Sequence, residues 1–330
     1  MTDLTTRYLG LTLKSPIIAG SSGLTKSIDN LKKIESHGAG AVVLKSLFEE
    51  QIHFESQKQI RDNEAATGYG YAEAYDLISN YSRDHHLGEY LDLIKKAKAE
   101  LTIPVIASIN CYSASEWVDF AKKIEDAGAD ALELNVFILP TDTEMNGDEY
   151  KQIYLDIIKK VKASTKLPVA VKIGSYFTDM GNWVTKLSWT EVDGIVMFNR
   201  FFTPDIDIER LKHIGGGRFS TEEEFYNVMR WIGILSDGVQ CDLCASTGIH
   251  NGDAVIKQLL SGAKAVQMAS VLYQKGFVEI ENANKRLSQW MQSHGYTKLD
   301  DFVGSMSMSK AENPAAFTRV QFMKHFAGIE

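Results

Sequence analysis

The 330-residue sequence contains few cysteines and no long apolar run. Three cysteines, Cys111, Cys241 and Cys244, are too few for a disulfide framework and favour a reducing compartment. No apolar run reaches the ~18 residues that a membrane-spanning helix needs. The opening MTDLTTRYLG lacks the charged-then-apolar pattern of a secretion signal. We therefore predict a cytoplasmic protein that does not cross a membrane.

An excess of positive charge is also missing, because 35 basic residues face 43 acidic ones and the net charge is −8. This balance gives no support for a nucleic-acid partner. Cys241 and Cys244 form a C-x-x-C, but no second pair and no histidine at ligand spacing accompanies it. We predict buried small side chains here and no metal site, with metal or redox use as the alternative.

One short pattern recurs along the chain, in HGAGAVVLKS at 37, AGADALELNV at 127, VDGIVMFNR at 192 and SGAKAVQMAS at 261. It predicts a helix that ends near a glycine and is followed by a strand buried on both faces. Similar apolar runs occur near 15 (SPIIAGSS), 103 (IPVIASIN), 167 (LPVAVKIG) and 239 (VQCDLCAS), which brings the total to eight. Helical patterns separate them, over 27–36, 113–127, 148–163 and 221–235 among others.

Eight strands that alternate with helices predict a single (β/α)8 TIM barrel over residues 1–330, rather than an open sheet. An open doubly wound sheet is the alternative, but no G-x-G-x-x-G follows the first strand. Residues 47–87 and 200–220 form insertions after the second and sixth strands, and we predict that both are lids over the barrel mouth. The tail from about 271 is predicted to begin with a helix packed on the outside.

Polar residues mark the C-terminal ends of the predicted strands, where barrel ligands bind. Lysines at buried strand ends need an anionic partner or cofactor, because an unpaired charge there is too costly. The alternative is that each lysine pairs with a neighbouring carboxylate. The residues at these ends are Ala19, Gly20, Ser21, Lys45, Ser46, Asn110, Cys111, Asn135, Lys172, Asn199, Arg200, Ser246, Thr247, Gly248, Ala269 and Ser270.

The ends of the last two strands carry small residues at the turn into a helix, in ASTGIHNGDAV and MASVLYQKG. Such turns expose backbone N–H groups that can hold a phosphate, and this is the usual phosphate position in these barrels. Together with Lys45 and Lys172, the pattern points to flavin mononucleotide (FMN), with its ring across the barrel mouth.

The stretches SPIIAGSSG, VVLKS, ALELN, PVAVKIGSYF and STGIHNGDAVIKQLLSGAKAVQMAS resemble the dihydroorotate dehydrogenase family, most closely its soluble cytosolic class. The resemblance spans roughly residues 4 to 280. It implies an FMN enzyme that oxidises dihydroorotate to orotate in pyrimidine biosynthesis, as a homodimer, with fumarate as a candidate acceptor.

The resemblance also implies roles for individual residues. Lys45, Asn135, Lys172 and Asn199 would be catalytic, with Lys172 at the flavin N1/O2 edge and Asn199 bonded to the pyrimidine. Arg200 replaces a small polar family residue and could hold a carboxylate, or pair with Asp205 or Asp207. The cofactor-binding set would be Ala19, Gly20, Ser21, Lys45, Ser46, Asn110, Asn135, Lys172, Ser246, Thr247, Gly248, Ala269 and Ser270.

The general base of the family is missing. In the family, a cysteine or serine in Asn-Leu-Ser-Cys-Pro-Asn takes the C5 proton while the C6 hydride goes to flavin N5. Here the stretch is Asn135-Val136-Phe137-Ile138-Leu139-Pro140, without a thiol or hydroxyl at the base position. The candidate replacements are Cys111, Tyr112, Thr141, Asp142, Tyr69, Tyr71 and Tyr75.

Two other functions stay open from the sequence. The first is a flavin-binding barrel with another substrate or no dehydrogenase activity, which the missing base favours. The second is a lyase or aldolase for a phosphorylated sugar, with Lys172 as a Schiff-base lysine.

Overall fold

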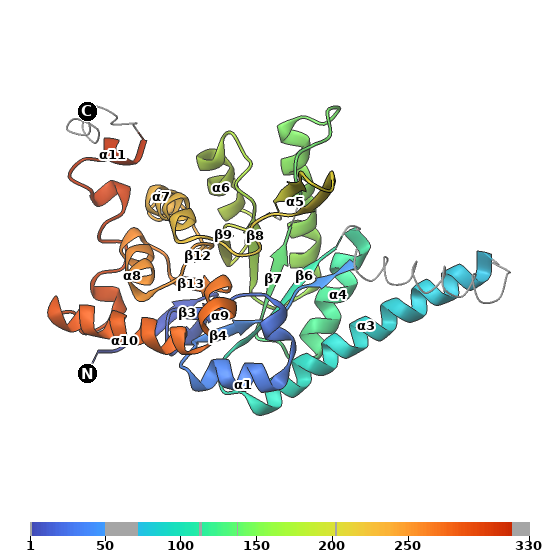
Figure 1. Ribbon diagram of the computed structural model, residues 1–330, viewed down its shortest axis with the longest axis horizontal. Helices are drawn as coiled ribbons and strands as arrows, with labels where there is room; N and C mark the ends of the chain where they lie inside the picture. Colours follow the sequence, from blue (N-terminus) through green and yellow to red (C-terminus); the bar gives the residue numbers. More distant parts are fainter. Residues whose placement is uncertain (1, 50–71, 112–113, 137, 202, 319–330) are drawn as a thin grey trace.

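The computed structural model describes residues 2–49, 72–111, 114–136, 138–201 and 203–318, and within them eight parallel strands form a closed barrel (Figure 1). Pairing of β4 with β6 completes the ring. The predicted (β/α)8 barrel is therefore confirmed, and each strand falls within one of the eight predicted runs. The strands are β3 (Ile17–Ala19), β4 (Ala41–Val43), β6 (Val105–Asn110), β7 (Ala131–Asn135), β8 (Val169–Ile173), β9 (Gly194–Met197), β12 (Asp242–Ser246) and β13 (Ala265–Met268).

Helices surround this barrel, because their apolar faces cover the outer faces of the strands. In the described part of the chain, no helix is both long and apolar enough to span a membrane. The α-helices are α1 (Ile28–Ser36), α3 (Ala72–Glu100), α4 (Ala114–Asp126), α5 (Gly147–Ser164), α6 (Met180–Ser188), α7 (Phe225–Leu235), α8 (Gly252–Ser261), α9 (Ser270–Lys275), α10 (Val278–Ser293) and α11 (Ala315–Thr318). Short 3-10 helices are η1 (Gly23–Lys26), η2 (Glu222–Glu224), η3 (Leu299–Asp301) and η4 (Met308–Lys310).

The recurrent helix-to-strand pattern has a backbone cause at three of its four positions. Gly38, Gly128 and Gly262 adopt φ values of 90°, 90° and 117°, which glycine reaches at low steric cost. The fourth position differs, because Gly194 lies inside β9 and Glu191 takes the positive φ before the strand. Gly194 instead allows close packing, since a Cβ there would lie 2.6 Å from Leu9 Cδ2.

An antiparallel hairpin, β1 (Thr6–Tyr8) and β2 (Leu11–Leu13), closes the bottom of the barrel. Tyr8, Leu9 and Leu13 are buried in one apolar cluster with the inward-facing residues of the strands. Asp242, at the start of β12, accepts a hydrogen bond of 2.8 Å from the Leu9 backbone N–H. Within the described residues, the interior is thus filled from below, which leaves the opposite end for a ligand.

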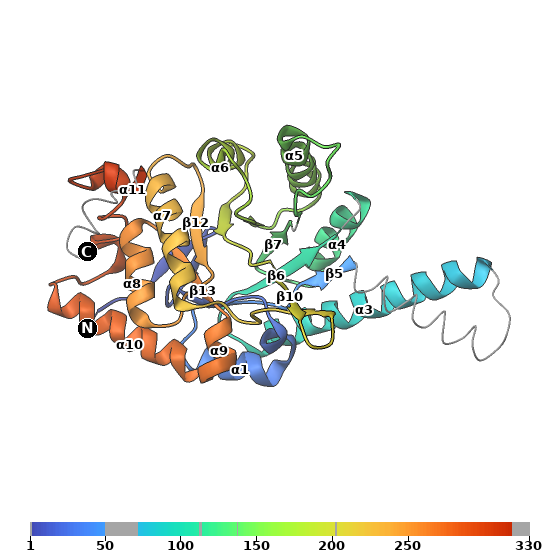
Figure 2. The ribbon, with the colours of Figure 1, turned by 45° about the horizontal axis from the view of Figure 1, so that its top comes forward.

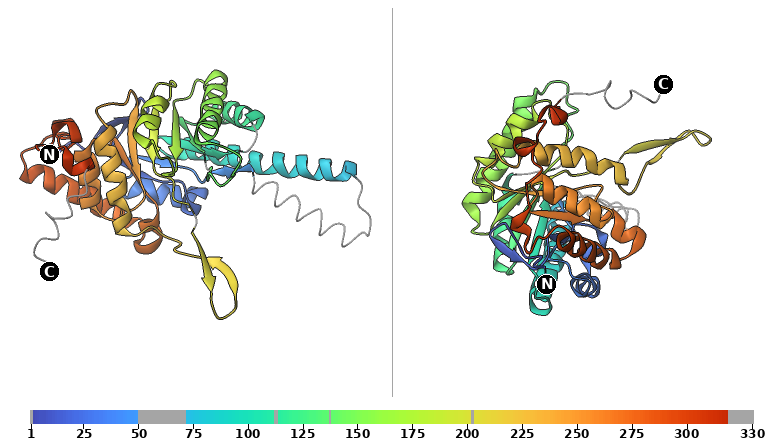
Figure 3. Two further views of the ribbon diagram at one scale, coloured as in Figure 1. Left: turned by 90° about the horizontal axis from the view of Figure 1, so that it is seen from above. Right: turned by 90° about the vertical axis from the view of Figure 1, so that its left-hand side faces the viewer.

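The two predicted lids are not confirmed. Residues 50–71 of the first insertion lie outside the described residues, and α3, which follows them, extends well beyond the barrel (Figure 2). The second insertion forms the hairpin β10 (Pro204–Asp207) and β11 (Lys212–Gly215), which projects away from the barrel (Figure 3). The short strand β5 (Leu47–Phe48) adds to β6 at the start of the first insertion. The lid roles stay predictions.

The C-terminal tail begins with a helix on the outside of the barrel, as predicted. Helix α10 contacts α8 and α9, and buries Ile280, Leu287 and Met291. Further along, Phe302 is buried. The ring of Phe317 packs against Gly233 of α7, because a Cβ added to Gly233 would lie 2.6 Å from that ring. The described part of the tail, up to Thr318, therefore packs against the helices outside the barrel.

We expect Leu13→Ala to lower the free energy of unfolding by about 2–5 kcal/mol, because it opens a cavity at the barrel bottom. The matched control is Leu211→Ala on the hairpin, since Leu211 is 86% exposed and Leu13 is fully buried. Urea denaturation of both variants measures the difference. Equal losses for the two variants would contradict the role given to the β1–β2 hairpin.

Candidate functional site

A cavity of about 200 Å³ opens at the C-terminal ends of the strands, and we call it the mouth pocket. Nine residues that the sequence nominated line it together, because parallel strands deliver their C-terminal ends to one rim. They are Ser21, Lys172, Asn199, Arg200, Ser246, Thr247, Gly248, Ala269 and Ser270; the lining also includes Phe198, Arg218, Ser220, Ile249 and Gln267.

The turn after β12 presents backbone donors to this pocket. Thr247 and Gly248 have φ values of 85° and 77°, and the Thr247 hydroxyl donates to the carbonyl of Phe198 at 3.0 Å. Only glycine fits at 248, because a Cβ would lie 2.3 Å from the Phe225 backbone nitrogen. Within the described residues, nothing accepts a hydrogen bond from the Gly248 N–H. Such a donor suits an anionic ligand.

Lys172 is the most deeply buried of the three basic side chains of the mouth pocket, which also include Arg200 and Arg218. It lies at the end of β8 with 8% of its surface exposed, and its Nζ donates to Gln267 Oε1 at 2.8 Å. The carboxylate of Glu133 lies 3.8 Å from Nζ, so this lysine has a neighbouring acid. The pairing with a carboxylate is therefore confirmed for Lys172, and its contact with a cofactor stays a prediction.

Two asparagines form an amide pair beside Lys172. The Nδ2 of Asn199 donates to Oδ1 of Asn135 at 2.7 Å, and Asn135 is paired in register with Lys172 across β7 and β8. The remaining candidates Ala19, Gly20 and Asn110 lie at their predicted strand ends but outside the lining of the mouth pocket. Gly20 is held there by its N–H, which donates to the Met268 carbonyl at 2.9 Å.

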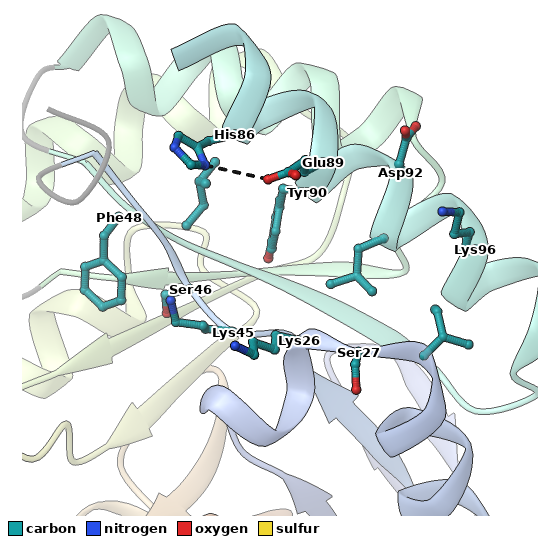
Figure 4. A pocket seen from close by; sticks show the side chains of 13 residues that line it. Lys26, Ser27, Lys45, Ser46, Phe48, His86, Glu89, Tyr90, Asp92 and Lys96 are labelled. Atoms are coloured by element: carbon teal, nitrogen blue, oxygen red, sulfur yellow. Dashed lines mark ion pairs between the residues drawn. The ribbon is translucent and has the colours of Figure 1, made fainter. Parts of the chain in front are cut away.

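Lys45 and Ser46 line a second, larger cavity of about 550 Å³, the side pocket, between η1 and α3 (Figure 4). It carries three lysines, together with His86 and Glu89, which lie 3.7 Å apart. The two pockets adjoin, because Ser21 Oγ lies 3.1 Å from Ser46 Oγ and accepts from its backbone N–H at 2.9 Å. The remaining lysines are Lys26 and Lys96.

Sequence reasoning missed several residues of the mouth pocket and its walls. The Ser220 hydroxyl lies 2.9 Å from His250 Nε2, and the Ser220 N–H donates to Ser270 Oγ at 3.0 Å. Arg218 lines the pocket from the same insertion. Gln267 could have been found from the sequence, because a glutamine inside the apolar run of β13 needs a buried hydrogen-bond partner.

The stretch that replaces the family's base is apolar and mostly packed. Val136 is buried, Ile138 packs against the core, and Leu139 is 46% exposed. Phe137 lies outside the described residues. The fold therefore offers no hydroxyl, thiol or carboxylate from 136, 138 or 139.

The candidate replacement bases have different surroundings. Burial, with Glu49 and Glu116 nearby, raises the pKa of the Cys111 thiol far above its usual value, so this thiol stays protonated. Thr141 and Asp142 are exposed, and Asp142 Oδ1 accepts from the Glu144 N–H at 2.9 Å. Tyr69, Tyr71 and Tyr112 lie outside the described residues, as does the side chain of Tyr75.

Arg200 does not pair with Asp205 or Asp207, so that alternative is wrong. Its Nε donates to Glu224 Oε2 at 3.0 Å, and another guanidinium nitrogen donates to the Gly217 carbonyl at 2.7 Å. The partner is thus a carboxylate on η2 and not one on the projecting hairpin.

Both members of the C-x-x-C are free thiols. Cys244 is buried among the inward-facing residues of the barrel, and burial raises its pKa well above the usual range. The described residues contain no cluster of three or more side chains that could hold a metal ion. The arrangement at Cys244 is that of a small buried side chain.

Comparison with known proteins gives one consistent family. A family model described as dihydroorotate dehydrogenase matches residues 3–291. The chain is 24% identical over 311 residues to the catalytic subunit of dihydroorotate dehydrogenase B (NAD(+)) of Thermoplasma volcanium, covering 92% of this chain and 98% of that protein. It is 26% identical over 308 residues to dihydroorotate dehydrogenase A (fumarate) of Lactobacillus helveticus, covering 91% and 97%.

We expect His250 to make stability depend on pH. Burial lowers the pKa of this histidine, while the unfolded chain binds the proton with the ordinary pKa near ~6.5. The unfolded state therefore holds more protons as the pH falls below ~6.5, and acidification favours unfolding. Denaturant titrations should show that wild type loses more stability between about pH 7.5 and about pH 5.5 than His250→Gln does.

The control is His213→Gln, because His213 lies exposed on the hairpin. This variant should keep the pH dependence of the wild type. If His250→Gln also keeps it unchanged, the account of His250 is wrong.

Proposed function

The chain belongs to the dihydroorotate dehydrogenase family, a family of oxidoreductases, and we propose that it binds FMN and oxidises a CH–CH bond of dihydroorotate or a similar ring. The observation that carries this proposal is the nearly buried Lys172 in the same pocket as the unpaired donor turn at Gly248. A cation and an anion-binding turn within one pocket suit a ligand with an electron-accepting ring and a phosphate.

The residues present fit FMN. The phosphate would be held by the turn after β12 and the start of α9, through Ser246, Thr247, Gly248, Ala269 and Ser270, with Arg218 adding positive charge. The ring would lie toward the adjoining side pocket, near Lys45 and Ser46. Ala19, Gly20, Ser21, Asn110, Asn135 and Lys172 would complete its surroundings.

Bound FMN would supply the acceptor for a hydride, while the side chains orient and stabilise. Lys172 would supply a positive charge at the edge of the ring, which favours its reduced form. Asn135 and Asn199 provide amide donors and acceptors for a planar, amide-bearing substrate, and their mutual hydrogen bond holds both in place. Lys45 adds a second cation at the rim.

The described residues include no side chain at the family's base position that could remove a proton from the substrate. General-base catalysis contributes ~10²–10⁴-fold in typical enzymes. Because the base position is aliphatic here, we propose that proton removal from dihydroorotate is slow in this protein. The same feature favours the second candidate function, a flavoprotein whose substrate differs from dihydroorotate.

A Schiff-base lyase is less well supported. Such chemistry needs a lysine amine that is available to attack a carbonyl. Lys172 is instead hydrogen-bonded to Gln267 and lies beside Glu133.

The electron acceptor, the assembly state and the location stay predictions. The relatives include both NAD(+) and fumarate types, so fumarate is one of two acceptors to test. The homodimer is supported by exposed apolar side chains on the hairpin region, among them Ile206, Ile208 and Leu211. Sedimentation equilibrium of the full chain tests it, and a monomer at micromolar concentration would contradict it.

We expect the purified protein to bind FMN noncovalently and to be yellow. Under anaerobic conditions, dihydroorotate should bleach the flavin band, with a rate limited by proton removal. A flavin that dithionite reduces but dihydroorotate does not would favour the flavoprotein with another substrate. A colourless protein that binds no added FMN and is trapped by borohydride with a sugar phosphate would favour the lyase.

A cysteine at the base position should accelerate this reduction. We expect Ile138→Cys or Leu139→Cys, which correspond to the two alignments of the family motif, to raise the anaerobic reduction rate by up to ~10²–10⁴-fold. Stopped-flow absorbance measures the rate. Ile138→Ala and Leu139→Ala are the matched controls, because they change side-chain volume without adding a base. If the cysteine variants reduce no faster than the alanine variants, the missing base is not the obstacle.

A further inference from the structure

A chain of three polar side chains lies inside the barrel, directly beneath the mouth pocket. Lys172 Nζ donates to Gln267 Oε1 at 2.8 Å, and Gln267 Nε2 donates to Glu133 Oε2 at 2.5 Å. The three residues come from β8, β13 and β7 and are 8%, 2% and 1% exposed. They therefore form one buried unit that connects the rim with the barrel interior.

The alternation of side chains along the strands explains why these residues meet. Ala131, Ala170 and Ala265 face the closed lower interior. Two residues further along each strand, Glu133, Lys172 and Gln267 point to the same side, one layer higher. The polar layer thus lies between the apolar plug below and the mouth pocket above.

This unit is not explained by stability alone. Burying an ion pair costs about as much desolvation as it returns, so an apolar layer would serve the fold at least as well. Glu133 Oε1 has no hydrogen-bond partner within the described residues, which adds to the cost. The Glu133 carboxylate lies 3.8 Å from Lys172 Nζ, a distance at which its charge can influence that lysine.

We propose, resting on the function proposed above, that Glu133 and Gln267 set the position and effective charge of Lys172, and thereby the reduction potential of the bound flavin. Both are positioning residues, because Glu133 lies outside the lining of the mouth pocket and Gln267, which lines it, acts by holding Lys172 Nζ. Glu133 offsets part of the positive field of Lys172. Gln267 keeps Nζ at the mouth and away from Glu133, since it bonds to both.

The two roles predict potential shifts of opposite sign. Glu133→Gln keeps the shape and the hydrogen-bond acceptor but removes the negative charge, so the lysine should stabilise reduced flavin more strongly. We expect the equilibrium between oxidised and reduced flavin to move about tenfold toward reduction, about 30 mV for a two-electron couple. Gln267→Met removes the spacer, lets Lys172 approach Glu133, and should lower the potential by a similar amount.

The experiment measures the midpoint potential of FMN bound to each full-length variant, by equilibration with reference dyes, together with FMN affinity and melting temperature. Lys172→Met gives the potential without the cation. In that background, Glu133→Gln should shift the potential clearly less than it does with Lys172 present, because most of the effect of the carboxylate is exerted by holding the lysine. Asp242→Asn is the control: its carboxylate lies at the opposite end of β12, and its loss should alter stability but not potential.

Each outcome separates the two proposals. Wild type that binds no FMN rejects the proposed function and this inference with it. Wild type that binds FMN, with unchanged potentials in Glu133→Gln and Gln267→Met, overturns only the inference. A full shift from Glu133→Gln in the Lys172→Met background also overturns it, since the carboxylate would then act on the flavin directly.

Discussion

Closure of the barrel between β4 and β6 is the constraint on which the site depends. Once the ring is closed and the β1–β2 hairpin fills the bottom, all eight strand ends meet at a single open rim. Residues as distant in sequence as Ser21 and Ser270 then line one cavity. A charged side chain such as Lys172 can be largely buried there, because neighbouring strands supply its hydrogen-bond and ion-pair partners. The same closure that stabilises the fold therefore builds the site.

The site combines two parts that differ in how closely they follow the family. The anion-binding turn, Lys172 and the amide pair Asn135–Asn199 lie where we propose the cofactor binds. The loop after β7 is apolar, and the buried thiol of Cys111 does not replace the base. In the proposed function, electron transfer and proton transfer would therefore depend on separate elements, and the loop after β7 is the one that lacks the expected base. Because the proposed cofactor residues and the base position lie on different elements, a flavin site can be retained while the substrate changes.

Much of this arrangement could be predicted from the sequence, because strand ends in a closed barrel converge by topology alone. Lys172, Asn199 and the turn from Ser246 to Gly248 followed from that rule. Partners that depend on side-chain reach did not follow from it. Arg200 bonds to Glu224 on η2 rather than to the nearer acids in sequence, because the hairpin that carries those acids projects outward. The link from Glu133 to Lys172 through Gln267 needed the register of three strands, which composition does not give.

The most direct test of this account is a crystal structure of the full-length protein with FMN. The account predicts the phosphate against the backbone of Thr247 and Gly248 and at the start of α9, with the pyrimidine edge of the ring at Lys172 Nζ. FMN density with the phosphate in the side pocket, or a ring edge that faces away from Lys172, would contradict it.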